Sequence, residues 1–283
     1  PTGFKWKTAA DAKADRKFIV CNADEGDSGT FADRMIMEGD PFVLIEGMTI
    51  AGIAVGATHG HVYIRSEYPH AVAAMNRAIA TARTAGYLGS SVCGSKYSFN
   101  LEVRVGAGAY VCGEETSLLE SIEGKRGQVR AKPPLPAHVG LFGKPTVINN
   151  VLSLASVPVI LDKGGAFYRD FGMGRSLGTM PFQLAGNIRQ GGLVERAFGL
   201  TLHADFRERR FVGLRAHGRR GGKCCQRGDC RLFESDVWKC VHYGSRSGLD
   251  DGWLFRDAGW LAAVVLRRYL VSISFPLLVS RSV

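Results

Sequence analysis

Short apolar runs alternate with longer apolar segments of helical length along the first half of the chain. Strands are predicted where the short runs are rich in β-branched and aromatic residues, at Lys17 to Cys21, His61 to Arg65 and Ser98 to Val105. Helices are predicted at Phe42 to Val55, behind the capping pair Asp40-Pro41, and at Pro69 to Ala85, which Gly86 ends. Strands that alternate with helices in this way indicate a layered α/β domain.

The helix predicted from Phe42 to Val55 is apolar nearly all round, which places it in the core and not on the surface. A further helix is predicted to begin at Thr146, whose hydroxyl can cap a segment running through Leu152. Its first turn holds two consecutive asparagines, Asn149 and Asn150. These are open to two interpretations, as capping residues or as part of a polar site.

Glycines and carboxylates are concentrated after the third predicted strand. Gly106, Gly108 and Gly113 follow that strand, and Glu114 and Glu115 open a helix-like run. Acids in a first helical turn are favoured by the helix dipole, so capping explains one carboxylate but not the Gly-Ala-Gly-Ala-Tyr loop. A strand, a glycine loop and a helix start are together typical of a site for a phosphate-bearing cofactor.

Two other polar segments are candidates for the same site. The run from Asn22 to Thr30 holds three acids and two glycines directly after the first strand, as either a solvated turn or a site loop. Four basic residues follow the glycine loop, namely Lys125, Arg126, Arg130 and Lys132. A charge run of this kind is either a solvated face or a partner for an anionic dinucleotide.

The charge of the chain is unevenly distributed. The 283 residues carry a net charge of +10, yet those from His203 onward hold 15 Lys and Arg against 8 Asp and Glu, so residues 1–202 carry only +3. An apolar fraction of 46% and a charged fraction of 22% are ordinary for a soluble globular protein of one or two domains. The high basicity therefore belongs to the tail and disfavours a nucleic-acid-binding function for the main region.

The seven cysteines do not form the compact framework of a secreted protein. Cys21, Cys93 and Cys112 are scattered, and are expected to be buried free thiols in a reducing, cytoplasmic environment. The apolar run from Trp260 to Val279 carries Arg267 and Arg268 at its centre, which argues against a membrane span. The first residues resemble the middle of a motif, so an N-terminal fragment boundary is expected there.

The stretch from Gly106 to Ser121 resembles the signature of the flavin-binding subunit of NADH dehydrogenases, the family of respiratory complex I and its soluble relatives. The resemblance covers about residues 1–202. It implies an α/β domain over residues 1–175 that binds FMN and NADH and has Rossmann-like features, followed over residues 176–202 by the start of a small β-grasp-like domain. Residues 203–283 form an atypical basic tail, either the product of a frameshift or a divergent domain.

The resemblance also implies roles for individual residues. Glu115 is expected to act at the nicotinamide, with Asp27 and Lys132 binding the nucleotide substrate. The positions that match FMN contacts in the family are Lys5, Asn22, Asp24, Glu25, Tyr110, Gly113, Glu114, Glu115, Asn149 and Asn150. The loops holding Asp24, Glu115 and Asn150 are predicted to converge on one cavity. No metal ligand is predicted among these residues.

Within the family, the run from Asn22 to Phe31 most resembles the flavin subunit, or beta subunit, of soluble NAD-dependent formate dehydrogenases. The expected function is the diaphorase part of such an enzyme, with iron–sulfur and catalytic subunits as partners. Complex I and NAD-linked hydrogenase flavin subunits are the alternatives. An inactive truncated product and a basic nucleic-acid-binding protein are alternatives from other classes.

Family members also carry a four-iron, four-sulfur cluster on a Cys-x-x-Cys-x-x-Cys motif with a distant fourth cysteine. This tail has Cys224, Cys225, Cys230 and Cys240 instead. Short Cys-x-x-Cys spacings supply several thiolates to a cubane cluster from one loop, whereas adjacent cysteines tend to diverge. The tail is therefore not expected to build the cluster.

Overall fold

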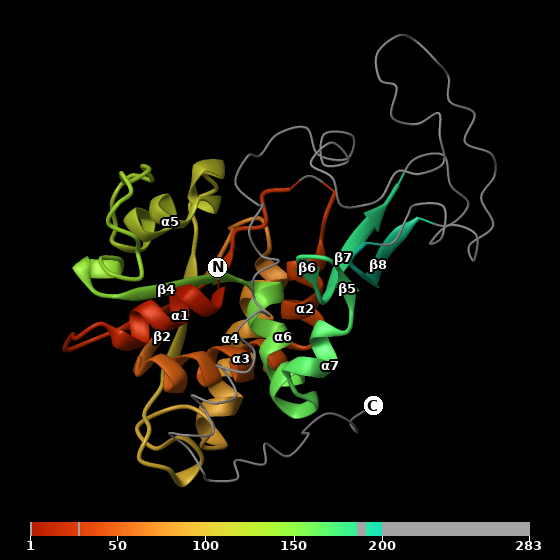
Figure 1. The fold of residues 1–283 in the computed structure, drawn as a ribbon. Helices are drawn as coiled ribbons and strands as arrows, with labels where there is room; N and C mark the ends of the chain where they lie inside the picture. The colour runs from red at the N-terminus through yellow and green to blue at the C-terminus, as the bar shows by residue number, and fades with distance from the viewer. Residues whose placement is uncertain (1, 28, 186–190, 200–283) are drawn as a thin grey trace.

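The computed structural model describes residues 2–27, 29–185 and 191–199 of the chain. Four parallel strands form its central sheet, in the order β3-β2-β1-β4 (Figure 1). They are β1 (Phe18–Ala23), β2 (His59–Ile64), β3 (Asn100–Val105) and β4 (Thr146–Asn150). The parallel register places Asn22 of β1 beside Asn150 of β4, so both strands end at the same edge of the sheet.

Helices cover both faces of this sheet. The α-helices are α1 (Thr2–Asp11), α2 (Ala32–Gly39), α3 (Pro41–Val55), α4 (Pro69–Thr84), α5 (Glu115–Ile122), α6 (Val151–Lys163) and α7 (Gly165–Arg169). Single 3-10 turns occur at η1 (Val92–Gly94), η2 (Tyr110–Gly113) and η3 (Leu141–Gly143). Figure 1 shows α5 on one side of β4 and α1 on the other. The predicted α/β fold class is confirmed.

The alternation of side chains along the strands produces two hydrophobic layers. Ile19 and Cys21 of β1 belong to the larger layer, which packs against α1, α3, α4 and α6. Phe18 and Val20 belong to the smaller layer, with Leu118 of α5. The all-round apolar composition of α3 follows from its position, because sheet and helices surround it, and its predicted place in the core is confirmed.

The contact between α3 and α6 explains a glycine in the middle of a helix. A Cβ atom on Gly47 would lie 2.0 Å from the carbonyl oxygen of Leu154, so only glycine allows the two backbones to approach this closely. The N-terminal end of α3 matches its predicted capping pair, Asp40-Pro41, and the C-terminal end is formed by Gly56. The Asp40 side chain accepts a hydrogen bond from the Val43 amide at 3.4 Å, and Gly56 adopts a left-handed conformation at φ 78°.

The segment from Thr146 to Leu152 differs from its prediction as a helix that Thr146 caps. Thr146–Asn150 is the edge strand β4, and the helix α6 begins only at Val151. Asn150 is its N-cap, and its Oδ1 accepts a hydrogen bond from the Leu152 amide at 2.8 Å. The strand prevails because the β-branched pair Val147 and Ile148 buries one side chain in each hydrophobic layer.

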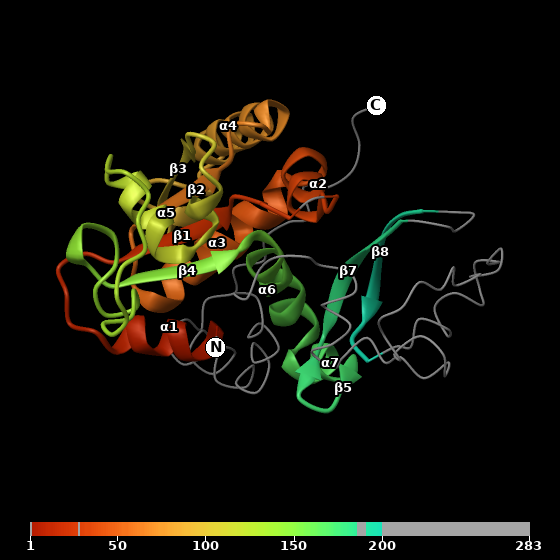
Figure 2. The same cartoon turned by 90° about the horizontal axis from the view of Figure 1, so that it is seen from above.

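Beyond α7 the architecture changes to short antiparallel pairs. These are β5 (Gly172–Met173) with β6 (Ser176–Leu177), and β7 (Thr179–Leu184) with β8 (Gly192–Ala197). Figures 1 and 2 both show β7 and β8 beyond α6 and α7, away from the central sheet. The β-grasp assignment of residues 176–202 and the boundary at 175 remain predictions. The basic tail and its four cysteines lie outside the described residues.

The three described cysteines are free, as predicted, but only Cys21 and Cys112 are buried. The predicted burial of Cys93 is wrong, because this residue is exposed in the turn η1. Cys21 lies in the larger hydrophobic layer, where burial raises the pKa of its thiol well above the ordinary value. None of the helices in the described residues combines the length and hydrophobicity that crossing a bilayer requires.

Candidate functional site

The carboxyl edge of the central sheet is the natural place for a ligand in this topology. From β1 the chain crosses to β2 on one side, whereas β4 pairs with β1 on the other side. In open α/β sheets, a crevice forms outside the strand ends where the direction of winding reverses. Here that point lies between β1 and β4, at Asn22 and Asn150.

Segments that are far apart in the sequence meet at this edge. The Asn22 side-chain amide donates a hydrogen bond to the carbonyl oxygen of Gly113 at 2.8 Å, which joins the loop after β1 to the glycine loop after β3. Lys5 Nζ of α1 lies 2.7 Å from Glu115 Oε2 and 3.4 Å from the carbonyl oxygen of Ile148 in β4. The edge thus gathers residues from α1, β1, β4 and the start of α5.

Lysine side chains hold the two adjacent glutamates. Lys132 Nζ lies 2.9 Å from Glu114 Oε1 and 2.8 Å from Glu115 Oε1. Burial raises the pKa of Glu115, but Lys5 and Lys132 outweigh it, so this pKa lies below its ordinary value. Glu115 is therefore an anion between two cations, each of which can also contact a bound anion.

Glu114 has a second, structural role. Its Oε2 accepts hydrogen bonds from the amides of Thr116 at 2.8 Å and Ser117 at 3.0 Å, so Glu114 is the N-cap of α5. Burial would raise the pKa of this carboxyl, but the Thr116 hydroxyl, Lys132 and the two amides lower it to about 2. The capping interpretation is confirmed for Glu114, whereas Glu115 lies at the sheet edge and its role in a site remains a prediction.

The charged form of the Asp24 side chain is destabilised by burial. Burial raises the pKa of its carboxyl to about 6, which Arg65 only partly offsets. Within the described residues, no hydrogen bond to this carboxylate is found. A Cβ atom on Gly113 would lie 3.5 Å from Asp24 Oδ2, so the glycine loop passes directly beside it. A partly desolvated acceptor at a ligand edge is a feature of binding sites.

Tyr110 and Asp27 lie on the exposed side of the edge. The Tyr110 side chain is 65% exposed, and a Cβ atom on Gly26 would lie 2.8 Å from its ring. Asp27 is exposed, at the end of the same loop. The structure therefore places the Tyr110 ring against Gly26, and Asp27 at the next position of that loop.

Three predicted site residues instead use their side chains within the fold. Asn149 is buried, accepts a hydrogen bond from Trp6 Nε1 at 2.8 Å, and donates one to Thr2 at 3.3 Å. Asn150 caps α6, and its amide donates to Asp33 Oδ2 at 2.7 Å. Glu25 caps α2 and also bonds to Tyr68. Trp6, Asp33 and Tyr68 thus support the site, although sequence reasoning did not include them. Of these three, only Trp6 could have been suspected from the sequence, because it is adjacent to the predicted site residue Lys5.

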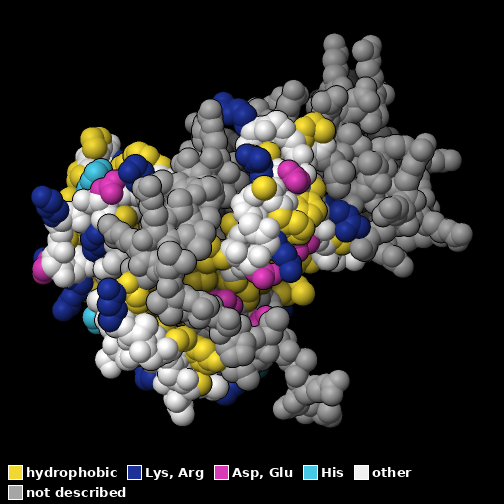
Figure 3. Space-filling model, turned by 60° about the horizontal axis from the view of Figure 1, so that its bottom comes forward, with side chains coloured by type: hydrophobic (Ala, Val, Ile, Leu, Met, Phe, Trp, Pro, Cys, Tyr) yellow, Lys and Arg dark blue, Asp and Glu magenta, His cyan; other side chains and the backbone are white. Residues whose placement is uncertain are grey.

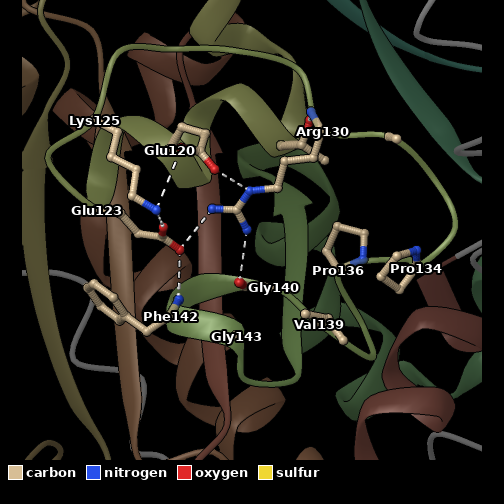
Figure 4. Close-up of a pocket in the computed structure, with 12 residues that line it drawn as sticks. Glu120, Glu123, Lys125, Arg130, Pro134, Pro136, Val139, Gly140, Phe142 and Gly143 are labelled. Carbon is tan, nitrogen blue, oxygen red and sulfur yellow. Dashed lines mark hydrogen bonds and ion pairs between the residues drawn. The ribbon is translucent and has the colours of Figure 1, made fainter.

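Three of the four basic residues after the glycine loop lie in two separate clusters, and the fourth, Arg126, is exposed. Lys132 reaches the sheet edge, whereas Arg130 and Lys125 pair with Glu120 and Glu123 at the other end of α5. This second cluster borders a cavity of about 550 Å³, shown in Figure 4. The Arg130 guanidinium there is held by two carboxylates and the Gly140 carbonyl oxygen, all within this loop, the end of α5 and the η3 region.

The predicted convergence of Asp24, Glu115 and Asn150 on one cavity remains a prediction. Their elements do meet at one edge of the sheet. The 550 Å³ cavity, however, is lined by none of these three residues. No cluster of His, Cys, Asp and Glu that could hold a metal ion is found within the described residues.

Comparison with known proteins identifies the family. Residues 1–159 match the model of the Nuo51 FMN-binding domain. The chain belongs to this family. The HndC protein of the NADP-reducing hydrogenase of Solidesulfovibrio fructosivorans is 50% identical over 202 residues, which cover 71% of this chain and 41% of that protein. An NADH-quinone oxidoreductase subunit of Rhizobium meliloti (strain 1021) is also 50% identical over 202 residues, and these cover 48% of it.

A solved structure of an NAD+-reducing NiFe hydrogenase in the air-oxidized state shares the fold, with a TM-score of 0.65 and 38% identity. The match covers 75% of this chain and 36% of that one. The chain thus spans about half, or less, of the length of these relatives. The predicted membership of the family of NADH dehydrogenase flavin subunits is confirmed, as is the family's FMN-binding character.

The residues at the sheet edge fit the cofactor that the family name implies. An isoalloxazine ring presents an N–H donor, and the Asp24 carboxylate is an acceptor without a hydrogen bond among the described residues. The FMN phosphate is an anion, and Lys5 supplies a cation at the same edge. A Cβ atom on Gly106 would lie 2.7 Å from the Tyr63 hydroxyl, so the first glycine of the loop is required for its path.

Proposed function

We propose that this chain is the FMN-binding part of a flavoprotein subunit that transfers electrons between NAD(H) and the iron–sulfur and catalytic subunits of a larger oxidoreductase. The observation that carries the proposal is the meeting of Lys5, Asn22, Gly113 and Glu115 at the point where the sheet reverses its winding. Membership of the FMN-binding family supports it.

The residues at the sheet edge have separate roles in binding the flavin and the nicotinamide nucleotide. Bound FMN supplies the redox chemistry, exchanging a hydride with the nicotinamide and single electrons with iron–sulfur clusters. Asp24 accepts a hydrogen bond from the flavin ring, and Lys5 contributes positive charge. Glu115 accepts a hydrogen bond from the nicotinamide carboxamide, and Lys132 and Asp27 bind the rest of the nucleotide. The backbone at Gly113 allows both ligands to approach closely.

The electron donor is the finer part of the proposal. The run from Asn22 to Phe31 favours the flavin subunit of an NAD-dependent formate dehydrogenase, in which electrons flow toward NAD+. The names of the relatives support the alternatives, a hydrogenase and an NADH-quinone oxidoreductase. Copurification of the protein with its native partners, followed by assays with formate, hydrogen and quinone, distinguishes these three.

A nucleic-acid-binding function is disfavoured by the arrangement of charge. On the face shown in Figure 3, the Lys and Arg side chains of the described residues are scattered among neutral and acidic ones. Sequence-independent binding to nucleic acid requires a continuous basic surface along the phosphate backbone.

FMN binding by the full chain tests the proposal. FMN titrated into the purified protein should lose its fluorescence at saturation, and NADH should then bleach the flavin absorbance. Lys5→Met should weaken FMN binding by about tenfold, the loss of one charge-assisted hydrogen bond. Lys7→Met is the matched control on the same helix, because Lys7 pairs with Asp11 on the exposed surface. A chain that binds no FMN, or two variants with equal affinities, would overturn the proposal.

A further inference from the structure

Glu25 is committed to the fold by both of its carboxylate oxygens. It is only 8% exposed, and its Oε1 and Oε2 accept hydrogen bonds from the amides of Asp33 and Arg34 at 3.1 and 3.3 Å. These amides belong to the first turn of α2, whose own N-cap residue, Phe31, provides no side-chain cap. Glu25 therefore caps α2 from a distance and ties the loop after β1 to that helix.

Two residues after β2 hold Glu25 from the other side. The hydroxyl of Tyr68, which is 7% exposed, donates a hydrogen bond to Glu25 Oε2 at 3.0 Å. Arg65 donates from Nη1 to the carbonyl oxygen of Glu25 and from Nη2 to Glu67 at 2.9 Å. The guanidinium groups of Arg65 and Arg34 lie 5.3 and 5.6 Å from the centre of the Tyr68 ring. The tyrosine is thus held between two cations.

The loop from Asn22 to Gly26 consequently has one anchor at each end. Asn22 is fixed to the glycine loop through the Gly113 carbonyl oxygen, and Glu25 is fixed to α2 and Tyr68. Asp24 lies between these anchors, with its carboxylate left for a ligand. We propose that Tyr68 is a positioning residue, which acts through Glu25 to hold Asp24 and Gly26 at the binding edge. The Glu25 side chain is accordingly a support for the loop.

This inference rests on the proposed function, and it separates a positioning role from a general contribution to stability. Burial raises the pKa of Glu25, and the hydroxyl of Tyr68 is among the donors that lower it again. Removing that hydroxyl raises the pKa further, so Glu25 becomes protonated at a higher pH and caps α2 less well. The ionisable groups around Glu25 are Asp24 on its own loop, Asp33 and Arg34 on α2, and Arg65, Glu67 and Tyr68 after β2.

The experiment measures FMN affinity against pH in the full chain. Tyr68→Phe should weaken FMN binding about three- to tenfold at neutral pH, and should move the acid limb of the profile upward by roughly half to one pH unit, the effect of one lost hydrogen bond. Tyr168→Phe is the matched control, a tyrosine 8% exposed whose hydroxyl lies 3.3 Å from Thr179, away from this edge. It should leave the FMN profile unchanged.

Glu25→Gln completes the test. This variant should remove the contribution of Glu25 to the acid limb of the FMN-binding profile and leave that of Asp24. Adding Tyr68→Phe to Glu25→Gln should therefore produce no further shift in pH. The inference would be overturned if Tyr68→Phe shifted the acid limb equally in the wild-type and Glu25→Gln proteins. It would also be overturned if Tyr68→Phe alone kept the wild-type FMN affinity and pH profile. Failure of the wild-type chain to bind FMN would instead contradict the proposed function. Thermal unfolding of each variant identifies those that are merely less stable.

Discussion

The two ends of α5 carry two ionic clusters, each of two glutamates and two basic side chains, which differ in how far along the chain their partners come from. At the N-terminal end, Glu114 and Glu115 meet Lys132 from the next loop and Lys5 from a helix 110 residues away in sequence. At the other end, the pairs are local, because Arg130 and Lys125 bind acids at most ten residues away. The first cluster thus connects α1, α5 and a loop at the candidate site, whereas the second connects only one loop to the end of α5.

The comparison shows that position in the fold distinguishes these clusters better than charge or cavity size. The second cluster borders the 550 Å³ cavity, and its charges are satisfied by one another and by backbone groups of the η3 region. The first cluster adjoins Asp24, whose carboxyl is raised to a pKa of about 6 by burial. A binding site commonly holds a carboxylate that burial destabilises, such as Asp24 at the sheet edge. A scaffold instead needs charges that are paired with one another, such as those of the second cluster.

The largest expected effect is that of Glu115→Gln. The loss of one charge-assisted hydrogen bond, about 1.5–3 kcal/mol, should change the affinities for NADH and NAD+ unequally, one of them by at least about tenfold. FMN affinity should be retained. Glu120→Gln, at the other end of the same helix, should leave both nucleotide affinities unchanged. If Glu115→Gln instead lost FMN and bound both nucleotides as the wild type does, Glu115 would be a flavin contact and not a nicotinamide contact.

Arg130→Gln should act on stability alone. Glu123 is 7% exposed at its side chain, so removing its partner should lower the free energy of unfolding at pH 7 by about 1–2 kcal/mol, with FMN affinity unchanged. Burial raises the pKa of Glu123, but Lys125 and Arg130 lower it on balance. The pair therefore stabilises the fold above the unfolded-state pKa of about 4.3, and this contribution is lost as the pH falls through the folded-state value.

Urea unfolding of Arg130→Gln at pH 7 and pH 3 checks this prediction, with the exposed Arg126→Gln as the control. The difference from wild type should shrink on acidification. A tenfold loss of FMN affinity in Arg130→Gln would remove the distinction between the two clusters.

Lys132→Gln should have a smaller effect, confined to the site. Lys132 is one-third exposed at its side chain, so its charge is partly screened, and nucleotide affinity should fall only about three- to fivefold. Lys125→Gln, in the second cluster, should not change this affinity. Isothermal titration with NAD+ measures both, and equal losses would show that the basic stretch acts only through its general charge.

Asp24→Asn should produce an effect of similar size to that of Lys132→Gln, but on stability and of opposite sign to that of Arg130→Gln. Because its folded-state pKa of about 6 lies above the unfolded value, Asp24 favours the folded state fully below about pH 4, and this contribution is lost as the pH rises through 6. Asn should therefore stabilise the protein at pH 8 by roughly 1 kcal/mol, after allowance for partial exposure, and not at pH 4. FMN affinity should fall at the same time.

Denaturant unfolding at both pH values checks this prediction, with Asp170→Asn as the exposed control. A less stable Asp24→Asn protein at pH 8 would show that the carboxylate supports the fold and is not strained within it.

Local signals in the sequence determined most of the sheet and its principal helices. The apolar runs at β1, β2 and β3 were found to within two residues at each end. Asp40, Pro41 and Gly86 mark helix ends through capping or through backbone conformations that other residues adopt less readily. The glycine loop before α5 was likewise recognisable, because its residues are contiguous. The resemblance of that loop to a family supplied the names of the site residues, including Lys5.

Only the tertiary structure decided what those side chains do. β4 was mistaken for a helix because its short run of β-branched residues gains its stability from pairing with β1. Asn149 and Glu25 are buried by contacts with Trp6, α2 and Tyr68, which no local pattern indicates. Lys132 and Arg130 are two residues apart, yet they reach opposite ends of α5. Local propensity acts over a few neighbouring residues, whereas a site depends on long-range packing that brings distant side chains together.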